Sequence, residues 1–120
     1  MNRKALGLVA GSEIVLAMHG CEGKDEVIYL GGRHAALVAS ISAALSKRGF
    51  SVGTHKNPDL QGVDRSNISN RGKLAMGVQF EITLALRLRL ADETGRSASP
   101  SIIDFVKAIG EGFSDLGLPL

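Results

Sequence analysis

The sequence predicts an α/β fold, with one domain over residues 1–120 and a mixed, mostly parallel β-sheet flanked by helices. The chain has 120 residues, the length of one ordinary domain. Short apolar runs bounded by glycine alternate with longer segments whose apolar residues recur at helical spacing. Hydrophobic residues make up 44% of the chain and aromatic residues only 4%. Layers of strands and helices must therefore bury a core made mainly of Leu, Ile, Val and Ala.

The first half of the chain predicts two helices and three strands. Residues 2–10 are expected to form a short helix. Residues 13–19 predict a buried central strand, and residues 26–30 a second strand rich in β-branched and aromatic side chains. Residues 33–48 are the clearest helix, because one apolar stripe runs along it and a glycine follows it. Residues 50–53 alternate as a third strand does. The helical stripe consists of Leu37, Val38, Ile41, Ala44 and Leu45.

The second half predicts a long loop, one strand and two helices. Residues 55–76 are polar and irregular, and a loop of that length is usually functional or mobile. Residues 77–82 alternate between apolar and polar side chains, as a strand does. Residues 84–93 alternate like a strand but have the composition of a helix, and we expect a helix. Ser99 and Pro100 predict the N-cap and first residue of a last helix. Its expected stripe is Ile102, Phe105, Val106, Ile109 and Phe113.

Charge and composition exclude several classes of protein. The net charge is +2 and the pI is near 8.9, but the cations are scattered and no basic stretch is interleaved with aromatics, which argues against a nucleic-acid partner. The apolar runs are too short to cross a membrane or to serve as a signal peptide. Cys21 is the single cysteine, so no internal disulfide forms. We expect a cytoplasmic protein.

Four polar residues are candidates for a functional site. His19 ends a predicted strand, where ligands gather in open α/β sheets; it could equally be a histidine hydrogen-bonded near a strand end. Glu81 lies inside an apolar strand pattern, where a partly buried carboxylate suits general acid/base work; alternatively it faces solvent. Asn70 and Arg71 belong to the polar loop, where arginine offers a planar fork for carboxylates; a solvated turn is the competing interpretation.

Spacing alone predicts no complete catalytic or metal site. A catalytic zinc needs three protein ligands, and the sequence contains no HExxH, HxxE or paired-cysteine motif. Cys21 is close to His19 in sequence, which does not establish contact, so we expect an inert thiol. The residues by themselves therefore predict an α/β domain with a polar site at one sheet edge.

Four segments in combination resemble a known family. In order and spacing, "MHGCEG", "IYLGGRHAALVASISAALSKRGF", "NISNRG" and "GVQFEITLALR" are similar to the poly-γ-glutamate hydrolase family, whose members are often labelled phage-related replication proteins. The resemblance covers about residues 13–90. It implies a compact relative of the zinc carboxypeptidases, with an α/β core and one zinc ion.

The resemblance also implies roles for the four candidates. His19 would be the last zinc ligand, and Glu81 the general base that activates the zinc-bound water. Asn70 and Arg71 would hold a carboxylate of the substrate. That substrate would be anionic poly-γ-glutamate or a related peptide, hydrolysed at its γ-glutamyl amide bonds.

The sequence departs from the family pattern at its N-terminus. Family members carry a "HGGxIExGT" segment there, which supplies a histidine and a glutamate as further zinc ligands, and this sequence starts after it. We therefore expect an N-terminally truncated core with an incomplete zinc site and little or no activity. The alternative is a non-catalytic binding domain, which could form a homo-oligomer to cover an exposed sheet edge.

Overall fold

The computed structural model describes residues 13–92 and 99–119, so the helix expected over residues 2–10 lies outside the described residues. The strands are β1 (Leu16–Cys21), β2 (Ile28–Gly31), β3 (Val52–Gly53) and β4 (Val78–Thr83). The helices are α2 (Ala35–Lys47), α3 (Leu84–Leu90) and α4 (Ile102–Asp115), with two short 3-10 turns, η1 (Pro58–Leu60) and η2 (Ile68–Asn70), in the long loop. The helix predicted from residues 84–93 is therefore present.

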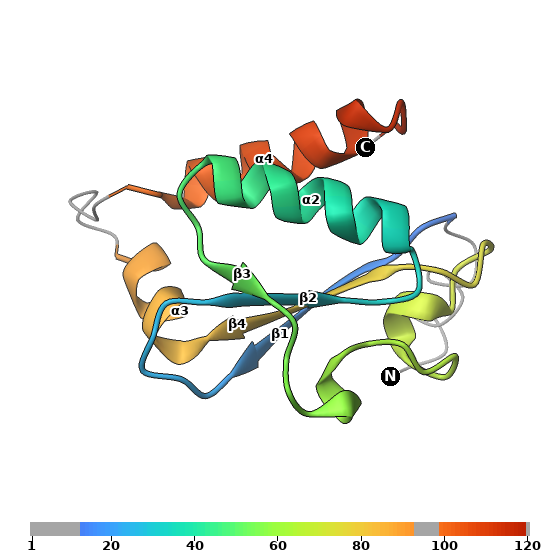
Figure 1. The fold of residues 1–120 in the computed structure, drawn as a ribbon, viewed down its shortest axis with the longest axis horizontal. Helices are drawn as coiled ribbons and strands as arrows, with labels where there is room; N and C mark the ends of the chain where they lie inside the picture. The colour runs from blue at the N-terminus through green and yellow to red at the C-terminus, as the bar shows by residue number, and fades with distance from the viewer. Residues whose placement is uncertain (1–12, 93–98, 120) are drawn as a thin grey trace.

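The four described strands form one mixed sheet in the order β1-β4-β2-β3 (Figure 1). β4 is central, parallel to β1 on one side and antiparallel to β2 on the other. β2 and β3 pair in parallel. The mixed, mostly parallel sheet is thus confirmed. The central position expected for residues 13–19 is wrong, because β1 lies at an edge of the described sheet.

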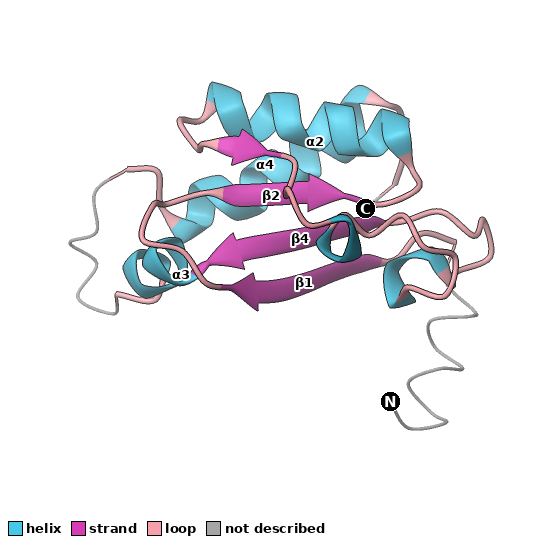
Figure 2. Ribbon diagram, turned by 60° about the horizontal axis from the view of Figure 1, so that its bottom comes forward, coloured by secondary structure: helices cyan, strands magenta, loops and turns pink. Residues whose placement is uncertain are grey.

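The two sides of the sheet are covered differently. α2 and α4 lie side by side over one face, and α3 follows the end of β4 (Figure 1). The opposite face carries the long loop with its short 3-10 turns (Figure 2). A helical layer on one side and a loop layer on the other confirm the predicted α/β class. No helix in the described ranges is long and apolar enough to cross a membrane.

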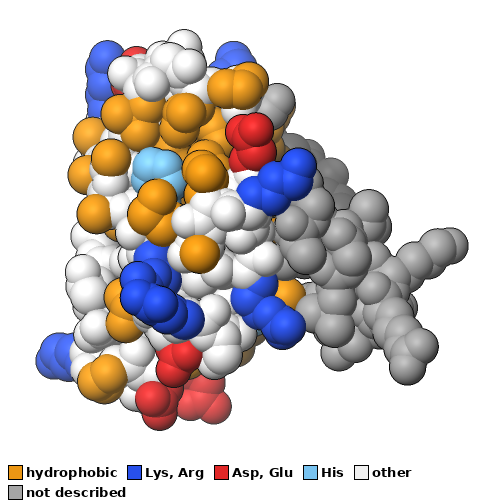
Figure 3. All heavy atoms as spheres, turned by 90° about the vertical axis from the view of Figure 1, so that its right-hand side faces the viewer, with side chains coloured by type: hydrophobic (Ala, Val, Ile, Leu, Met, Phe, Trp, Pro, Cys, Tyr) orange, Lys and Arg blue, Asp and Glu red, His pale blue; other side chains and the backbone are white. Residues whose placement is uncertain are grey.

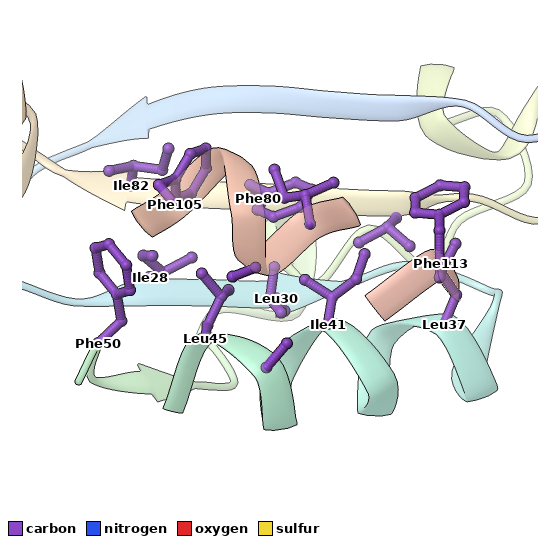
Figure 4. Close-up of a cluster of buried hydrophobic side chains, with 14 of the residues drawn as sticks. Ile28, Leu30, Leu37, Ile41, Leu45, Phe50, Phe80, Ile82, Phe105 and Phe113 are labelled. Carbon is purple, nitrogen blue, oxygen red and sulfur yellow. The ribbon is translucent and has the colours of Figure 1, made fainter. Parts of the chain in front are cut away.

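The apolar core fills the space between the sheet and the two long helices (Figure 4). The stripe predicted on α2 faces this space, with Val38 only partly buried at its margin. The core is built from aliphatic side chains with four phenylalanines among them. Its main members are Ile28, Leu30, Leu37, Ile41, Leu45, Phe50, Val78, Phe80, Ile82, Phe105, Ile109 and Phe113.

Helix α4 differs from its prediction at its start and along its stripe. Ser101, rather than Ser99, is the N-cap, because Ser101 and Asp104 form a reciprocal capping box that satisfies two free N–H groups. Ile102 and Val106 are 48% and 59% exposed. The buried side of α4 is turned away from them and carries Phe105, Ala108, Ile109, Gly112 and Phe113.

Candidate functional site

The alternation of β4 divides its side chains between two environments. Residues at even positions face α2 and α4 and join the core. Gln79, Glu81 and Thr83 point to the opposite face, since successive side chains of a strand alternate, and they are nevertheless only 2–4% exposed. The alternative that Glu81 faces solvent is therefore wrong. Its carboxyl group lies under the loop layer.

The structure brings His19 and Glu81 together. They are direct partners in the parallel pairing of β1 and β4, so their side chains leave the same face of the sheet from backbones about 4.8 Å apart. Glu81 is buried, whereas His19 is exposed on the edge strand. No hydrogen bond joins the His19 ring to another described residue. The pair thus consists of a sheltered carboxylate beside an accessible imidazole.

Cys21 lies on this same face, two residues beyond His19. Burial raises the pKa of the Cys21 thiol, the nearby Glu81 carboxylate raises it further, and Arg87 lowers it. A raised pKa means less thiolate at neutral pH. The surroundings therefore agree with the predicted inert thiol.

Glu81 is held by neighbours on its own face. The Gln79 side-chain nitrogen donates a hydrogen bond to Glu81 Oε1 at 3.1 Å. On the other side, Tyr29 of β2 is the antiparallel partner of Glu81, and its ring meets the edge of the His55 ring, with centroids 4.8 Å apart. The sheltered carboxylate therefore has a polar neighbour along its own strand and an aromatic one across it.

The glycine that follows His19, Gly20, leaves room for the side chain of Arg87. Its side of the strand faces the guanidinium of Arg87, and a Cβ at residue 20 would lie 2.6 Å from Arg87 Cζ. Arg87 donates hydrogen bonds to the carbonyl oxygens of Cys21 (3.2 Å) and Ile82 (3.1 Å). The arginine thereby ties together the carboxyl ends of β1 and β4, where His19 and Glu81 lie.

Asn70 is buried, only 2% exposed, and is fully engaged with the backbone. Its Oδ1 accepts from the N–H groups of Arg33 (3.2 Å) and Gly77 (3.1 Å). Its Nδ2 donates to the carbonyl oxygens of Gly62 (2.6 Å) and Asp64 (2.8 Å). Asn70 thus joins distant segments of the loop layer to β4 and α2.

Arg71 directly follows Asn70 but is exposed, at the C-terminal end of η2. The loop that carries it has an excess of cations, four against two carboxylates over residues 55–76. Lysine and arginine side chains gather on this end of the molecule, below an apolar area (Figure 3). The loop layer therefore offers positive charge beside the face that carries Glu81.

Gln79 and Arg87 are not among the site residues predicted from the sequence. The alternation of residues 77–82 places Gln79 on the same face as Glu81, so that signal could have identified it. No sequence pattern connects Arg87 with Gly20, because the contact depends on how α3 folds back over β1.

The family model for poly-gamma-glutamate hydrolase matches residues 2–107. The chain belongs to the poly-gamma-glutamate hydrolase family. The relatives include two proteins of Bacillus subtilis (strain 168): UPF0714 protein YmaC, 30% identical over 82 residues, and UPF0714 protein YndL, 28% identical over 88 residues. These matches cover 68% and 72% of this chain and 35% of each relative.

Two solved structures have the same fold as this chain. A bacteriophage poly-gamma-glutamate hydrolase superposes with a TM-score of 0.84 at 21% identity, over 97% of this chain and 59% of that one. YndL in an apo, zinc-free form gives 0.82 at 22% identity, over 98% and 61%. This member of the family therefore spans about three-fifths of the solved structures and about one-third of the curated relatives.

The described residues do not fit a complete zinc site. Zinc needs at least three protein ligands, and within residues 13–92 and 99–119 no group of three His, Cys, Asp or Glu side chains is placed to hold a metal. His19 is the accessible donor in the pair, while one oxygen of Glu81 is already bonded to Gln79. Beyond these described donors, a metal in this member of the family would need further ligands.

Proposed function

We propose that this chain acts in the hydrolysis of γ-glutamyl amide bonds, with Glu81 as the general base. The observation that carries the proposal is the pairing of buried Glu81 with His19 on one face of adjacent strands. A carboxylate sheltered from bulk water can take a proton from an attacking water and pass it to the leaving amine. Membership of the poly-gamma-glutamate hydrolase family supplies the reaction class.

We assign His19 as one zinc ligand in this proposal. A neutral imidazole is a suitable ligand for zinc, and a zinc ion held by His19 and further ligands would lower the pKa of a bound water. The described residues do not provide the remaining ligands. The part of the reaction that we assign to this chain's own residues is therefore proton transfer by Glu81.

The substrate that we propose is a polyanion, poly-γ-glutamate or a related peptide. The excess of cations in residues 55–76 would draw such a substrate towards the loop layer. Arg71, exposed at the end of η2, is the residue that we propose to hold a substrate carboxylate, because its guanidinium can bind one through two hydrogen bonds. The engaged side chain of Asn70 would help by fixing the backbone next to Arg71. A free, half-buried Cys21 suits a reducing compartment, and we propose the cytoplasm.

The test measures shortening of poly-γ-glutamate by the purified chain with added zinc. Glu81→Gln should lower the rate about 10²- to 10⁴-fold, the usual contribution of a general base, while His19→Gln should weaken zinc binding measured by calorimetry. Glu22→Gln is the matched control, because Glu22 is an exposed carboxylate one residue beyond β1. The wild-type rate should be low, because the described residues supply an incomplete set of zinc ligands. Cleavage that is unaffected by Glu81→Gln, or no cleavage at all by the wild type, would contradict the proposal.

A second candidate function is a non-catalytic, self-associating domain. The position of β1 at an edge of the sheet formed by the described strands favours it, because Met18, His19 and Gly20 are exposed there and Met18 is 50% exposed. An unpaired strand edge is a template for pairing with another chain. Light scattering that gives a monomer at high concentration would argue against this candidate.

A further inference from the structure

We propose that Gln79 is a positioning residue that fixes the carboxylate of Glu81, and that Asn67 sets the direction in which Gln79 acts. This inference rests on the proposed function, because it concerns the residue named there as the general base. Its foundation is a line of hydrogen bonds that runs from the backbone of η2 through two side-chain amides to Glu81.

The line of hydrogen bonds begins at the backbone N–H of Ser69, which can only act as a donor. The backbone N–H of Ser69 donates to Asn67 Oδ1 at 3.0 Å, and the Ser69 hydroxyl donates to the same oxygen at 2.8 Å. With its oxygen fixed in this way, Asn67 must present its nitrogen on the other side. That nitrogen, Nδ2, donates to Gln79 Oε1 at 2.6 Å.

The orientation of the Asn67 amide in turn determines the orientation of the Gln79 amide, which contacts Glu81. Because its oxygen faces Asn67, its Nε2 faces the other way, and the two hydrogens of Nε2 match two acceptors. These acceptors are the Leu60 carbonyl oxygen at 3.3 Å and Glu81 Oε1 at 3.1 Å. A flipped Gln79 amide would place oxygen against both acceptors and nitrogen against a donor. One orientation is therefore imposed, and it ends in a donor aimed at the carboxylate.

Burial prevents Gln79 from relaxing into another arrangement. Its side chain is 3% exposed. The loop presses on it at Gly62, which has a φ of +68° and where a Cβ would lie 2.8 Å from Gln79 Cβ. Within the described residues Glu81 accepts a hydrogen bond only at Oε1. Gln79 thus occupies one carboxylate oxygen and leaves Oε2 for a proton.

The arrangement also links Glu81 to a hollow in the loop layer. Asn67 lines this hollow of about 330 Å³ together with Asp59, Gly62 and Asp64. A ligand that displaces the Asn67 amide would disturb Gln79 directly and Glu81 through it. The loop and the carboxylate are therefore parts of one hydrogen-bonded unit.

The test uses NMR three-bond couplings that report the χ1 rotamer of Glu81 in the full chain. Wild type should show a single rotamer, and Gln79→Met should show averaging, because methionine keeps the length of glutamine but donates nothing. Asn67→Asp should do the same with Gln79 intact, since an aspartate cannot donate to Gln79 Oε1; this variant serves if Gln79→Met fails to fold. Gln61→Met is the matched control, because Gln61 donates to His55 in the same loop and makes no bond to Glu81.

A kinetic measurement on poly-γ-glutamate complements the couplings. Gln79→Met should lower kcat about 10- to 100-fold, as misplacement of a catalytic group by about 1 Å does, and leave KM within about twofold. Single-rotamer couplings in both Gln79→Met and Asn67→Asp would overturn the inference. Rotamer averaging in these variants, with no hydrolysis by the wild type, would support the inference and overturn the proposed function.

Discussion

Replacing Asn70 should destabilise the fold rather than simply weaken substrate binding. The family resemblance implies that Asn70 holds a substrate carboxylate. In the structure, however, both the oxygen and the nitrogen of its side chain are hydrogen-bonded to backbone groups. Asn70→Ala would remove four hydrogen bonds at once. It would leave the Gly77 N–H and the Gly62 carbonyl without their bonds at a buried position.

The expected loss of stability follows from these four contacts. At a net value of about 1 kcal/mol each, they contribute about 4 kcal/mol to the free energy of unfolding. A small domain has a total of about 5–15 kcal/mol, so Asn70→Ala should leave a marginally folded protein. Asn70→Asp should be as harmful, because one carboxylate oxygen would face the carbonyl oxygens of Gly62 and Asp64 where Nδ2 now donates.

Urea unfolding monitored by circular dichroism measures this loss, with Arg71→Gln as the matched control. Arg71 is exposed, and exposed substitutions usually change stability by no more than about 0.5 kcal/mol. If Asn70→Ala retained the wild-type free energy of unfolding to within about 1 kcal/mol, the structural role would be wrong. If Arg71→Gln instead lost several kcal/mol, the assignment of Arg71 to substrate rather than fold would fail.

Two further predictions concern an arginine each. Gly20→Ala should lower the free energy of unfolding by about 1 kcal/mol, because the new methyl group displaces the Arg87 guanidinium from its two carbonyl partners; in an Arg87→Met background the same change should cost almost nothing, and an equal cost would contradict the contact. Arg48 bonds to Asp104 and Glu111 of α4. The pKa of Asp104 lies below its usual value chiefly through Ser101, and that of Glu111 chiefly through Arg48. A carboxylate whose pKa is lower in the folded state than in the unfolded state stabilises the fold at pH values above its unfolded-state pKa. This stabilisation is lost as the pH falls through the folded-state pKa. The free energy of unfolding should therefore fall as the pH drops below 4.5, the ordinary pKa of Glu111. It should fall less steeply with pH in Arg48→Met. Equal slopes of the free energy against pH in the two proteins, measured by urea unfolding, would contradict this.

The sequence predicted the helices and strands better than it predicted their positions in the fold and which of their faces are buried. Regular spacing is enough to identify α2 and β4, because periods of 3.6 and 2 are local properties of the chain. The edge position of β1 depends on long-range pairing, which its own residues do not specify. The same limit applies to Ile102 and Val106, which fit the helical stripe but are exposed once α4 has packed on α2.

The candidate site shows the same division between local and long-range information. The alternation of β4 predicts that Gln79 and Glu81 share a face, and the structure adds that this face is buried. Burial comes from the loop layer, which the polar composition of residues 55–76 could not reveal. The role of Asn70 was missed for this reason, since an asparagine in a polar loop has no local sign of four backbone partners.

One strand therefore serves both the core and the site. Phe80, fully buried, packs β4 against the helices, and Glu81, next to it, is carried on the other face. A shift of one residue in the register of β4 would place the carboxylate in the apolar core and the phenyl ring under the loop. The core thus fixes the register, and the register fixes where Glu81 lies relative to His19. The hydrogen bonds from Gln79 and the Arg87 contact to Gly20 need only refine a position that hydrophobic packing has already selected.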